Sequence, residues 1–144
     1  MPSRSQIYSD ADVTLLLRQY QVHPTVQRVA VAHALFSRGI HLSAEDLFRI
    51  VTASGTHVSK ATVYNTLGVL AEKGVIREVI ADPNRIFYDP NTSPHHHFYD
   101  EVSGELTDVD ASEVQITRLP PLPEGAQLQG IDVIIRLRPR SKPS

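Results

Sequence analysis

The sequence predicts an α+β fold in two parts: an N-terminal helical part closed by a β-hairpin, and a smaller C-terminal part dominated by short strands. Three observations support this. Apolar residues recur at helical spacing over the first half of the chain, two β-rich runs flank Asp82-Pro83-Asn84, and apolar and polar residues alternate in GIDVIIRLR. Pro and Asn cluster between Asp89 and Pro94, so we expect one domain at residues 1–89 and another at 90–144.

The composition is that of a globular chain without a strong charge. Of 144 residues, 41% are hydrophobic and 21% are charged, and the net charge is −2. This balance argues against a surface that coats nucleic acid generally, but it is compatible with a local DNA-reading face. The absence of cysteine excludes disulfides, thiolate zinc sites and cysteine nucleophiles. No apolar run approaches the roughly 18 residues of a membrane span, and MPSRSQIYSD lacks a secretory apolar segment, so we expect a cytoplasmic protein without membrane contact.

Start and stop signals divide the N-terminal part into four helices and a hairpin. SAED has the pattern of a capping box, and Gly39 stands where helices often end in a left-handed glycine. The helices are expected from Ser9 or Asp10 through Tyr20, from Pro24-Thr25 to Gly39, from Ser43 to Gly55 and from Ser59 to Gly74. The hairpin strands are expected at Val75 to Ala81 and Arg85 to Tyr88. This order predicts a winged helix-turn-helix domain, with the third and fourth helices as the helix-turn-helix pair.

The C-terminal part should be a small α/β domain. We expect strands at His97 to Asp100 and Glu105 to Val109, a short helix from Ala111 to Leu119, a last strand in GIDVIIRLR and a frayed tail in RPRSKPS. About fifty residues bury little apolar surface alone and usually need a metal, a disulfide or a partner. Since disulfides are excluded and Ile134 gives the last strand a second apolar face, we predict that this is a dimerisation domain and that the chain forms a homodimer.

The fourth helix has the features of a DNA-reading helix. At about 100° per residue, the buried stripe is expected at Val63, Leu67 and Leu70, and the opposite, exposed stripe at Ala61, Tyr64, Asn65 and Gly68. In a major groove, Asn65 can bond adenine, and Tyr64 can contact a thymine methyl or a phosphate. Ser59, Lys60 and Thr62 are placed to meet phosphates, and Arg85 lies near the tip of the wing. The alternative is an amphipathic helix whose polar face is only solvated; the preceding helices and the wing favour DNA binding.

Three of the seven histidines lie together in SPHHHFYDE, residues 93–101. One interpretation is a polar loop beside a strand, and the other is a metal or haem site. Residues two apart on an extended segment face the same way, so His95 and His97 can share one ion while His96 points elsewhere. Imidazole and carboxylate ligands without thiolate suit Fe²⁺, Mn²⁺ or Zn²⁺.

Several of these segments together resemble the ferric uptake regulator family. PTVQR (24–28), HLSAEDLF (41–48), SKATVYNTLGVLAEKGVI (59–76) and the HHH cluster match in order and spacing, over most of the chain. The resemblance implies a dimeric, metal-responsive transcription regulator that binds double-stranded DNA at an AT-rich inverted repeat, with Arg28 among the DNA contacts. PHHHFYDE, PPLPEG and GIDVIIRLR look most like the iron response regulator branch of rhizobia and relatives, whose members are implicated in haem- and iron-dependent control.

The resemblance also implies a regulatory metal site with ligands from both domains. At the matching places this chain has His41, Asp89, His95, His97 and Asp108. Five or six nitrogen and oxygen ligands favour Fe²⁺ or Mn²⁺ over tetrahedral zinc, although Zn²⁺ can bind such a set in vitro. His96 is left over, and it could bind haem iron axially or join a second metal with neighbouring acids.

The chain departs from the family in its lack of cysteine. Many relatives carry paired CxxC motifs that bind a structural zinc, and the first pair would fall here on Asp100 and Ser103. We therefore expect no four-cysteine zinc site, so packing must hold the dimer together. Pro94 stands where many relatives have another His, which weakens the case for a second metal.

Three alternatives stay open at this point. A peroxide-sensing regulator of the same family would oxidise His41 or His95 through bound Fe²⁺. A hydrolytic enzyme could use the same His and Asp ligands if one coordination position stayed open, but no nucleophile motif or phosphate loop accompanies them, so we expect no enzyme. A winged helix that serves only as a protein–protein adaptor ranks last.

Overall fold

The computed structural model describes residues 8–140. The chain divides into two compact units, the first ending at Thr92 and the second beginning at Ser93. The start of MPSRSQIYSD, up to residue 7, and the last four residues of the expected frayed tail lie outside the described residues.

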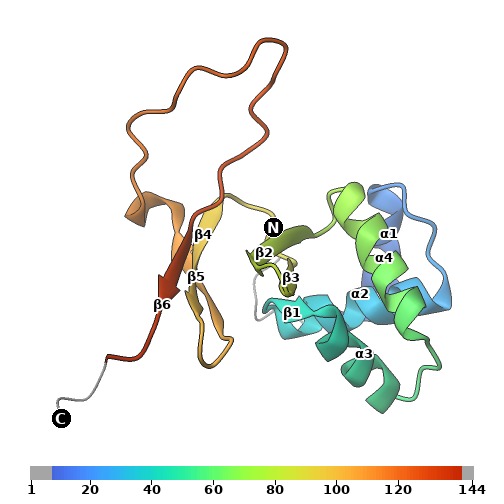
Figure 1. The fold of residues 1–144 in the computed structure, drawn as a ribbon. Helices are drawn as coiled ribbons and strands as arrows, with labels where there is room; N and C mark the ends of the chain where they lie inside the picture. Colours follow the sequence, from blue (N-terminus) through green and yellow to red (C-terminus); the bar gives the residue numbers. More distant parts are fainter. Residues whose placement is uncertain (1–7, 141–144) are drawn as a thin grey trace. The chain divides into compact units, whose positions relative to one another are not determined.

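The described part of the first unit contains the four helices that the sequence predicts (Figure 1). They are α1 (Asp10–Gln19), α2 (Val26–Arg38), α3 (Ala44–Ala53) and α4 (Lys60–Glu72). Each begins after a hydroxyl side chain that accepts a backbone N–H of the first turn; these N-caps are Ser9, Thr25, Ser43 and Ser59. The capping box at Ser43 is confirmed, because Asp46 accepts the Ser43 N–H in return. Gly39 takes a left-handed φ of 63° at the end of α2, a conformation that costs glycine little.

The predicted hairpin is also confirmed, and it gains a third strand. Strands β2 (Arg77–Asp82) and β3 (Arg85–Asp89) pair antiparallel, and β1 (Leu42–Ser43) adds to the other edge of β3. The two residues of β1 are too few to show an alternating pattern in the sequence. In this pairing Leu42 lies opposite Tyr88, so the chain just before α3 runs beside the end of the hairpin.

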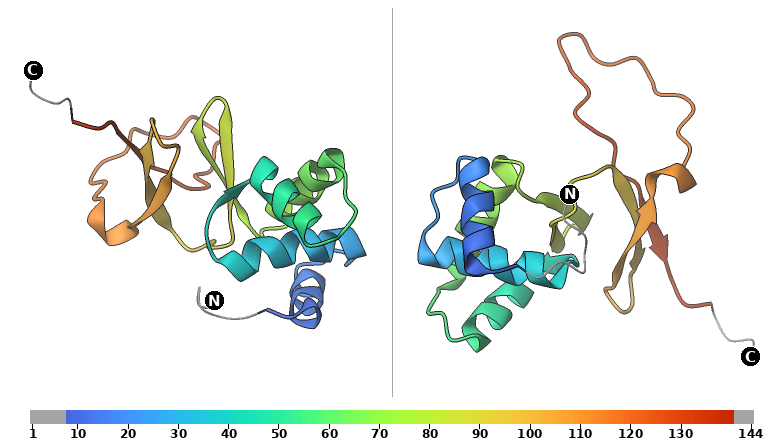
Figure 2. Two further views of the ribbon diagram at one scale, coloured as in Figure 1. Left: turned by 90° about the horizontal axis from the view of Figure 1, so that it is seen from below. Right: turned by 180° about the vertical axis from the view of Figure 1, so that it is seen from behind.

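The core of the first unit lies between the helices. Val63, Leu67 and Leu70 are fully buried, and Tyr64 on the other side of α4 is 49% exposed, which confirms the predicted division of this helix into two faces. Helix α4 packs on both α2 and α3. Both views in Figure 2 show the helices of this unit gathered to one side of its hairpin. No helix among residues 8–140 is long and apolar enough to cross a membrane.

The second unit is built on a three-stranded sheet in the order β5-β4-β6. Strand β4 (His95–Asp100) is central, β5 (Leu106–Asp110) runs antiparallel to it, and β6 (Ile134–Leu137) runs parallel to it. Strand β4 begins two residues earlier than predicted. All three clustered histidines therefore lie in a paired strand rather than in a loop.

One expectation for this unit was wrong, and another was met only in part. The helix expected from Ala111 to Leu119 is only a single 3₁₀ turn, η1 (Ala111–Glu113). The residues that follow include β-branched Val114, Ile116 and Thr117 and then prolines, all of which oppose helix propagation. After η1 the chain runs through a long segment without helix or strand before it reaches β6 (Figure 1). Strand β6 is also shorter than GIDVIIRLR, because only its last residues pair with β4.

We expect Leu67→Ala to lower the free energy of unfolding of the first unit by about 2–5 kcal/mol, because it leaves a cavity where α4 packs on its neighbours. Urea titration of the helical circular dichroism signal measures this change. Leu15→Ala is the matched control, since Leu15 is 59% exposed, and it should shift stability by less than about 0.5 kcal/mol. Equal unfolding midpoints for the two variants would contradict the assignment of the core.

Candidate metal centre and DNA-binding face

In the second unit, two histidines and one aspartate converge on the same face of the sheet. His95 and His97 are neighbours on one side of β4, with ring centroids 4.6 Å apart. Their Nε2 atoms lie 3.5 and 3.4 Å from the same oxygen, Oδ1 of Asp108. Asp108 reaches this place because β5 pairs with β4 in a register that sets it opposite His97. The arrangement is thus a consequence of strand pairing and of the two-residue period of a strand.

The tautomer of His95 is set by the backbone. Its Nδ1 lies 2.7 Å from the carbonyl oxygen of Ser93, and because a carbonyl can only accept, Nδ1 must carry the hydrogen. In the neutral ring the lone pair is then on Nε2, the atom that faces Asp108. This is how a metal-binding histidine is usually oriented: one nitrogen donates to a carbonyl and the other is left for the ion.

The distances fit a shared divalent ion. Two ligand atoms bonded at about 2.1 Å to one ion, at an angle of about 110°, lie about 3.4 Å apart. The separations of 3.4 and 3.5 Å from Asp108 Oδ1 to the two Nε2 atoms match this value. Imidazole nitrogens with a carboxylate oxygen are ligands that Fe²⁺, Mn²⁺ and Zn²⁺ all accept. His97 and Asp108 therefore each offer one ligand atom, and His95 offers another.

The first unit contains a second His–Asp pair. His41 Nε2 lies 3.9 Å from Oδ2 of Asp89, and Asp89 is only 2% exposed. The pairing of β1 with β3 brings them together, because His41 precedes Leu42, which lies opposite Tyr88. A buried carboxylate is costly unless a cation or hydrogen-bond donors compensate its charge. Asp89 Oδ1 accepts the Asn91 N–H at 2.9 Å, and Oδ2 is the atom turned to His41.

His96 has a different environment from its two neighbours. Its Nδ1 accepts the backbone N–H of Val133 at 3.1 Å, just before β6. The hydrogen of the neutral ring is therefore on Nε2, and neither nitrogen has a lone pair available for an axial bond to haem iron while this contact persists. This contact could not be inferred from the sequence, since Val133 is distant along the chain. The geometry assigns His96 to fixing the start of β6.

On α4, the residues expected to read DNA lie on an exposed face. Tyr64 and Asn65 are both exposed. A shallow polar depression of about 160 Å³ lies between the start of α2 and this face, and it is lined by Thr25, Gln27, Arg28, Thr62, Asn65 and Thr66. The structure thus brings Arg28, Thr62 and Asn65 to one place, although Arg28 also donates from Nη1 to the His23 carbonyl at 3.1 Å.

The remaining predicted DNA contacts have local partners. Ser59 caps α4 and lies 2.9 Å from the Thr62 hydroxyl, so both hydroxyls are partly engaged within the first turn. The Lys60 ammonium lies 5.7 Å from the centroid of the Phe48 ring, at cation–π distance. Arg85 is exposed at the start of β3, beside the hairpin turn, with its guanidinium 5.9 Å from the Phe87 ring centroid.

Glu45, a residue of α3 that contacts this face, was not among the residues predicted from the sequence. The Tyr64 hydroxyl on α4 donates a hydrogen bond to Oε1 of Glu45 on α3. This bond is the largest cause that lowers the pKa of Glu45, and it is also the largest cause that raises the pKa of Tyr64. Near neutral pH, Glu45 is therefore an anion and Tyr64 a neutral donor. In the sequence, Glu45 is only an acid in the first turn of a helix, where the helix dipole alone would explain it.

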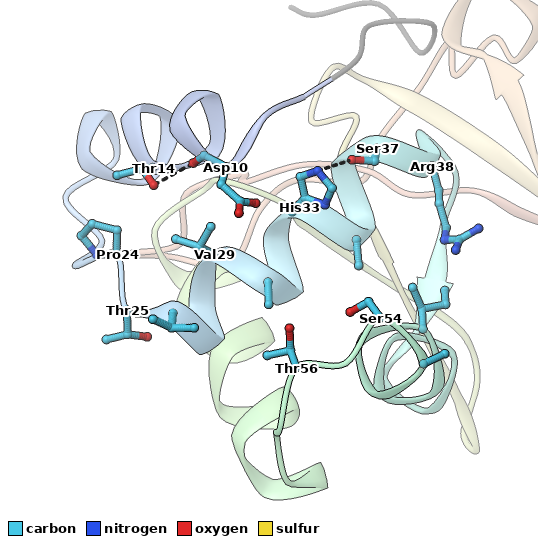
Figure 3. A pocket seen from close by; sticks show the side chains of 15 residues that line it. Asp10, Thr14, Pro24, Thr25, Val29, His33, Ser37, Arg38, Ser54 and Thr56 are labelled. Carbon is cyan, nitrogen blue, oxygen red and sulfur yellow. Dashed lines mark hydrogen bonds between the residues drawn. The ribbon is translucent and has the colours of Figure 1, made fainter.

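A larger groove lies elsewhere on the first unit, with a volume of about 940 Å³ (Figure 3). Residues of α1, α2 and α3 line it, and His33 lies at its wall. His33 Nε2 donates to the Tyr8 carbonyl at 2.9 Å, so this histidine holds the segment before α1 against α2. The groove thus has a packing histidine rather than a set of metal ligands.

Comparison with known proteins identifies the family. Residues 19–135 match the model of the Ferric uptake regulator family. The chain belongs to this family. The peroxide-responsive repressor PerR of Staphylococcus aureus is 31% identical over 104 residues, which span 72% of this chain and 70% of that protein. The relatives found establish the family and not the iron response regulator branch within it.

Solved structures of the family share the fold. The manganese-containing ferric uptake regulator of Pseudomonas aeruginosa superposes with a TM-score of 0.67 at 22% identity, over 87% of this chain and 96% of that one. The iron-containing regulator of Francisella tularensis gives 0.67 at 20% identity, over 82% and 92% of the two chains. The fold is thus an N-terminal winged helix-turn-helix domain followed by a C-terminal dimerisation domain, as predicted. Members of the family are metal-responsive transcription regulators and not enzymes, which confirms the expectation of no enzyme.

We expect Asp108→Asn to weaken Mn²⁺ binding by more than about tenfold, because the amide removes the anionic ligand while it keeps the size of the side chain. Isothermal titration of metal-stripped protein with Mn²⁺ measures the affinity. Asp110→Asn is the control, since Asp110 lies on the same strand but accepts the Ser112 N–H at 2.9 Å. Equal affinities for the two variants would show that Asp108 is not a ligand.

Proposed function

We propose that the chain is a homodimeric regulator of iron-linked genes that binds an AT-rich inverted repeat and responds to Fe²⁺ or Mn²⁺. The proposed ligands are His41, Asp89, His95, His97 and Asp108. The proposed DNA contacts are Arg28, Ser59, Lys60, Thr62, Tyr64, Asn65 and Arg85. Membership of a family of metal-responsive DNA-binding dimers supports the general function, and the local geometry supports the choice of residues.

The observation that carries the metal proposal is the orientation of His95. Its Nδ1 hydrogen bond to Ser93 leaves the Nε2 lone pair directed at a carboxylate oxygen 3.5 Å away. In the neutral ring this lone pair and the anionic oxygen repel each other, and a shared cation, either a proton or a metal ion, removes the repulsion. His97 Nε2, at 3.4 Å from the same oxygen, would complete a three-ligand set within the second unit.

His41 and Asp89 would supply the further ligands. A set of five nitrogen and oxygen donors favours Fe²⁺ or Mn²⁺ over zinc, which commonly takes four. An ion that draws ligands from both units would restrain one unit relative to the other when bound. This restraint would couple metal binding to DNA affinity.

The hydrogen bond that His96 accepts from Val133 opposes axial binding of haem iron by this residue. Haem binding through Nδ1 would require His96 to give up the Val133 N–H, and binding through Nε2 would in addition require its hydrogen to move from Nε2 to Nδ1. A response to haem, if present, would therefore depend on rearrangement at the start of β6.

Peroxide sensing is the second candidate function, because a peroxide-responsive repressor is 31% identical over 72% of this chain. His41 and His95 would be the oxidised residues. Aerobic loading with Fe²⁺ would then oxidise one of these residues. Mass spectrometry would detect the added mass of one oxygen in a peptide that contains it. An unchanged mass, with DNA binding that is reversible on metal removal, would favour simple metal sensing.

Fluorescence anisotropy of an AT-rich inverted-repeat duplex tests the main proposal. Adding Mn²⁺ to metal-stripped protein should tighten binding by about 5- to 150-fold, the usual range of coupling between two sites. His95→Ala combined with His97→Ala should abolish this change and leave the affinity of the metal-free protein intact.

His23→Ala is the control, since His23 is exposed and bonds Arg28 only through its backbone carbonyl. A normal metal response in the double variant would place the sensor elsewhere. Absence of DNA binding under every condition would remove the regulator proposal itself.

A further inference from the structure

The two helices of the helix-turn-helix are joined by a polar contact on the face proposed to meet DNA. Glu45 lies in the first turn of α3, and Tyr64 lies in the middle of α4, 19 residues later. Both side chains are exposed, so burial does not force them together. The Tyr64 hydroxyl has one hydrogen, and in this structure it is donated to the Glu45 carboxylate.

The neighbouring side chains make a second link of the same kind. Phe48 is one turn after Glu45 on α3, and Lys60 is one turn before Tyr64 on α4. The Lys60 ammonium lies 5.7 Å from the Phe48 ring centroid. Lys60 is also among the charges that lower the pKa of Glu45. Glu45 thus lies close to both an ammonium group and a phenol.

An acid at this position has consequences for DNA binding. A carboxylate repels phosphates, so it opposes any pose in which Tyr64 lies against the DNA backbone. The hydroxyl that would otherwise donate to a phosphate oxygen is already in use. What Tyr64 has left to present is its ring, which suits apolar contact with the C5 methyl group of thymine in the major groove.

We propose that Glu45 is a positioning residue that holds Tyr64 for contact with a thymine methyl and keeps it away from phosphates, so that it raises sequence preference at the expense of general DNA affinity. This inference rests on the proposed DNA-binding function. It assigns a role to a residue that was not among the expected DNA contacts. The alternative hypothesis is that Glu45 only stabilises the start of α3.

The test begins with a duplex that the protein chooses. Mn²⁺-loaded protein is used to select binding sequences from a randomised pool of double-stranded DNA, and each thymine of the selected duplex is then replaced by uracil, which lacks the methyl group. The position read by Tyr64 is the one at which this replacement weakens the parent protein but not Tyr64→Ala. For the parent we expect a loss of about fourfold, the effect of removing one buried methyl group.

Three variants separate positioning from charge. Glu45→Ala should reduce the thymine-to-uracil ratio at that position towards one, while affinity for an unrelated duplex rises. Glu45→Gln can still accept the hydroxyl hydrogen, so it should keep most of the ratio but show the same rise in non-specific affinity. Tyr64→Phe should lose the ratio like Glu45→Ala, and the double variant should lose no more than either single variant.

Glu72→Gln is the matched control, because it removes a negative charge from the last residue of α4, the helix that carries Tyr64. It should leave the ratio unchanged. Circular dichroism melting of Glu45→Ala should show no loss of fold, since the side chain is exposed.

Retention of the full thymine-to-uracil ratio by Glu45→Ala would overturn the proposal. Equal weakening of that variant on all duplexes, with lower thermal stability, would also overturn it and indicate a helix-stabilising role. Failure to select any duplex would instead count against the proposed DNA-binding function, so the two failures are distinguishable.

Discussion

The alternation of side chains along β4 is the constraint on which the second unit depends. A central strand is paired on both edges, so its residues cannot rotate to suit a ligand. His95 and His97 must therefore share one face, where Asp108 is delivered by the register of β5. His96 must face away, where it accepts the Val133 N–H at the start of β6. Adjacent histidines of one strand therefore have different partners: His95 and His97 face Asp108, and His96 faces the backbone before β6.

Strand pairing plays the same part in the first unit. A buried Asp89 at the end of β3 is tolerable only with compensating groups, and the short strand β1 brings His41 beside it. Because β1 leads directly into α3, whose N-cap is Ser43, the metal-ligand candidate and the helix-turn-helix are separated by few residues. A change in the position of His41 can therefore shift the start of α3 directly through the backbone.

The proposed DNA-binding face must distinguish between DNA sequences without a large excess of positive charge. The chain carries 14 Lys and Arg and 16 Asp and Glu, so a strong general attraction to phosphates is not available. The proposed role of Glu45 is consistent with this low positive charge, because an acid that positions the Tyr64 ring favours contacts with bases over contacts with the DNA backbone. The link between Lys60 and Phe48 likewise holds a cation against a ring of α3 instead of leaving it fully extended into solvent.

The sequence by itself determined the four helices, the hairpin and the two faces of α4. These follow from capping side chains, helical periodicity and turn residues, which act within a few positions along the chain. It also pointed to the His and Asp residues as metal ligands, through spacing and family resemblance. The helix predicted after Asp110 was too long. Asp110 does act as an N-cap, but the β-branched residues and prolines that follow end the helix after one turn.

Only the tertiary structure decided which ring nitrogen of His95 and of His96 carries the hydrogen, and which acid lies beside Tyr64. Hydrogen bonds from Val133 to His96 and from Tyr64 to Glu45 join residues that are 37 and 19 positions apart. Such contacts depend on how strands and helices pack, and packing leaves no periodic trace in the sequence. The local signals therefore specified the elements, and the distant contacts specified the chemistry of the side chains that those elements carry.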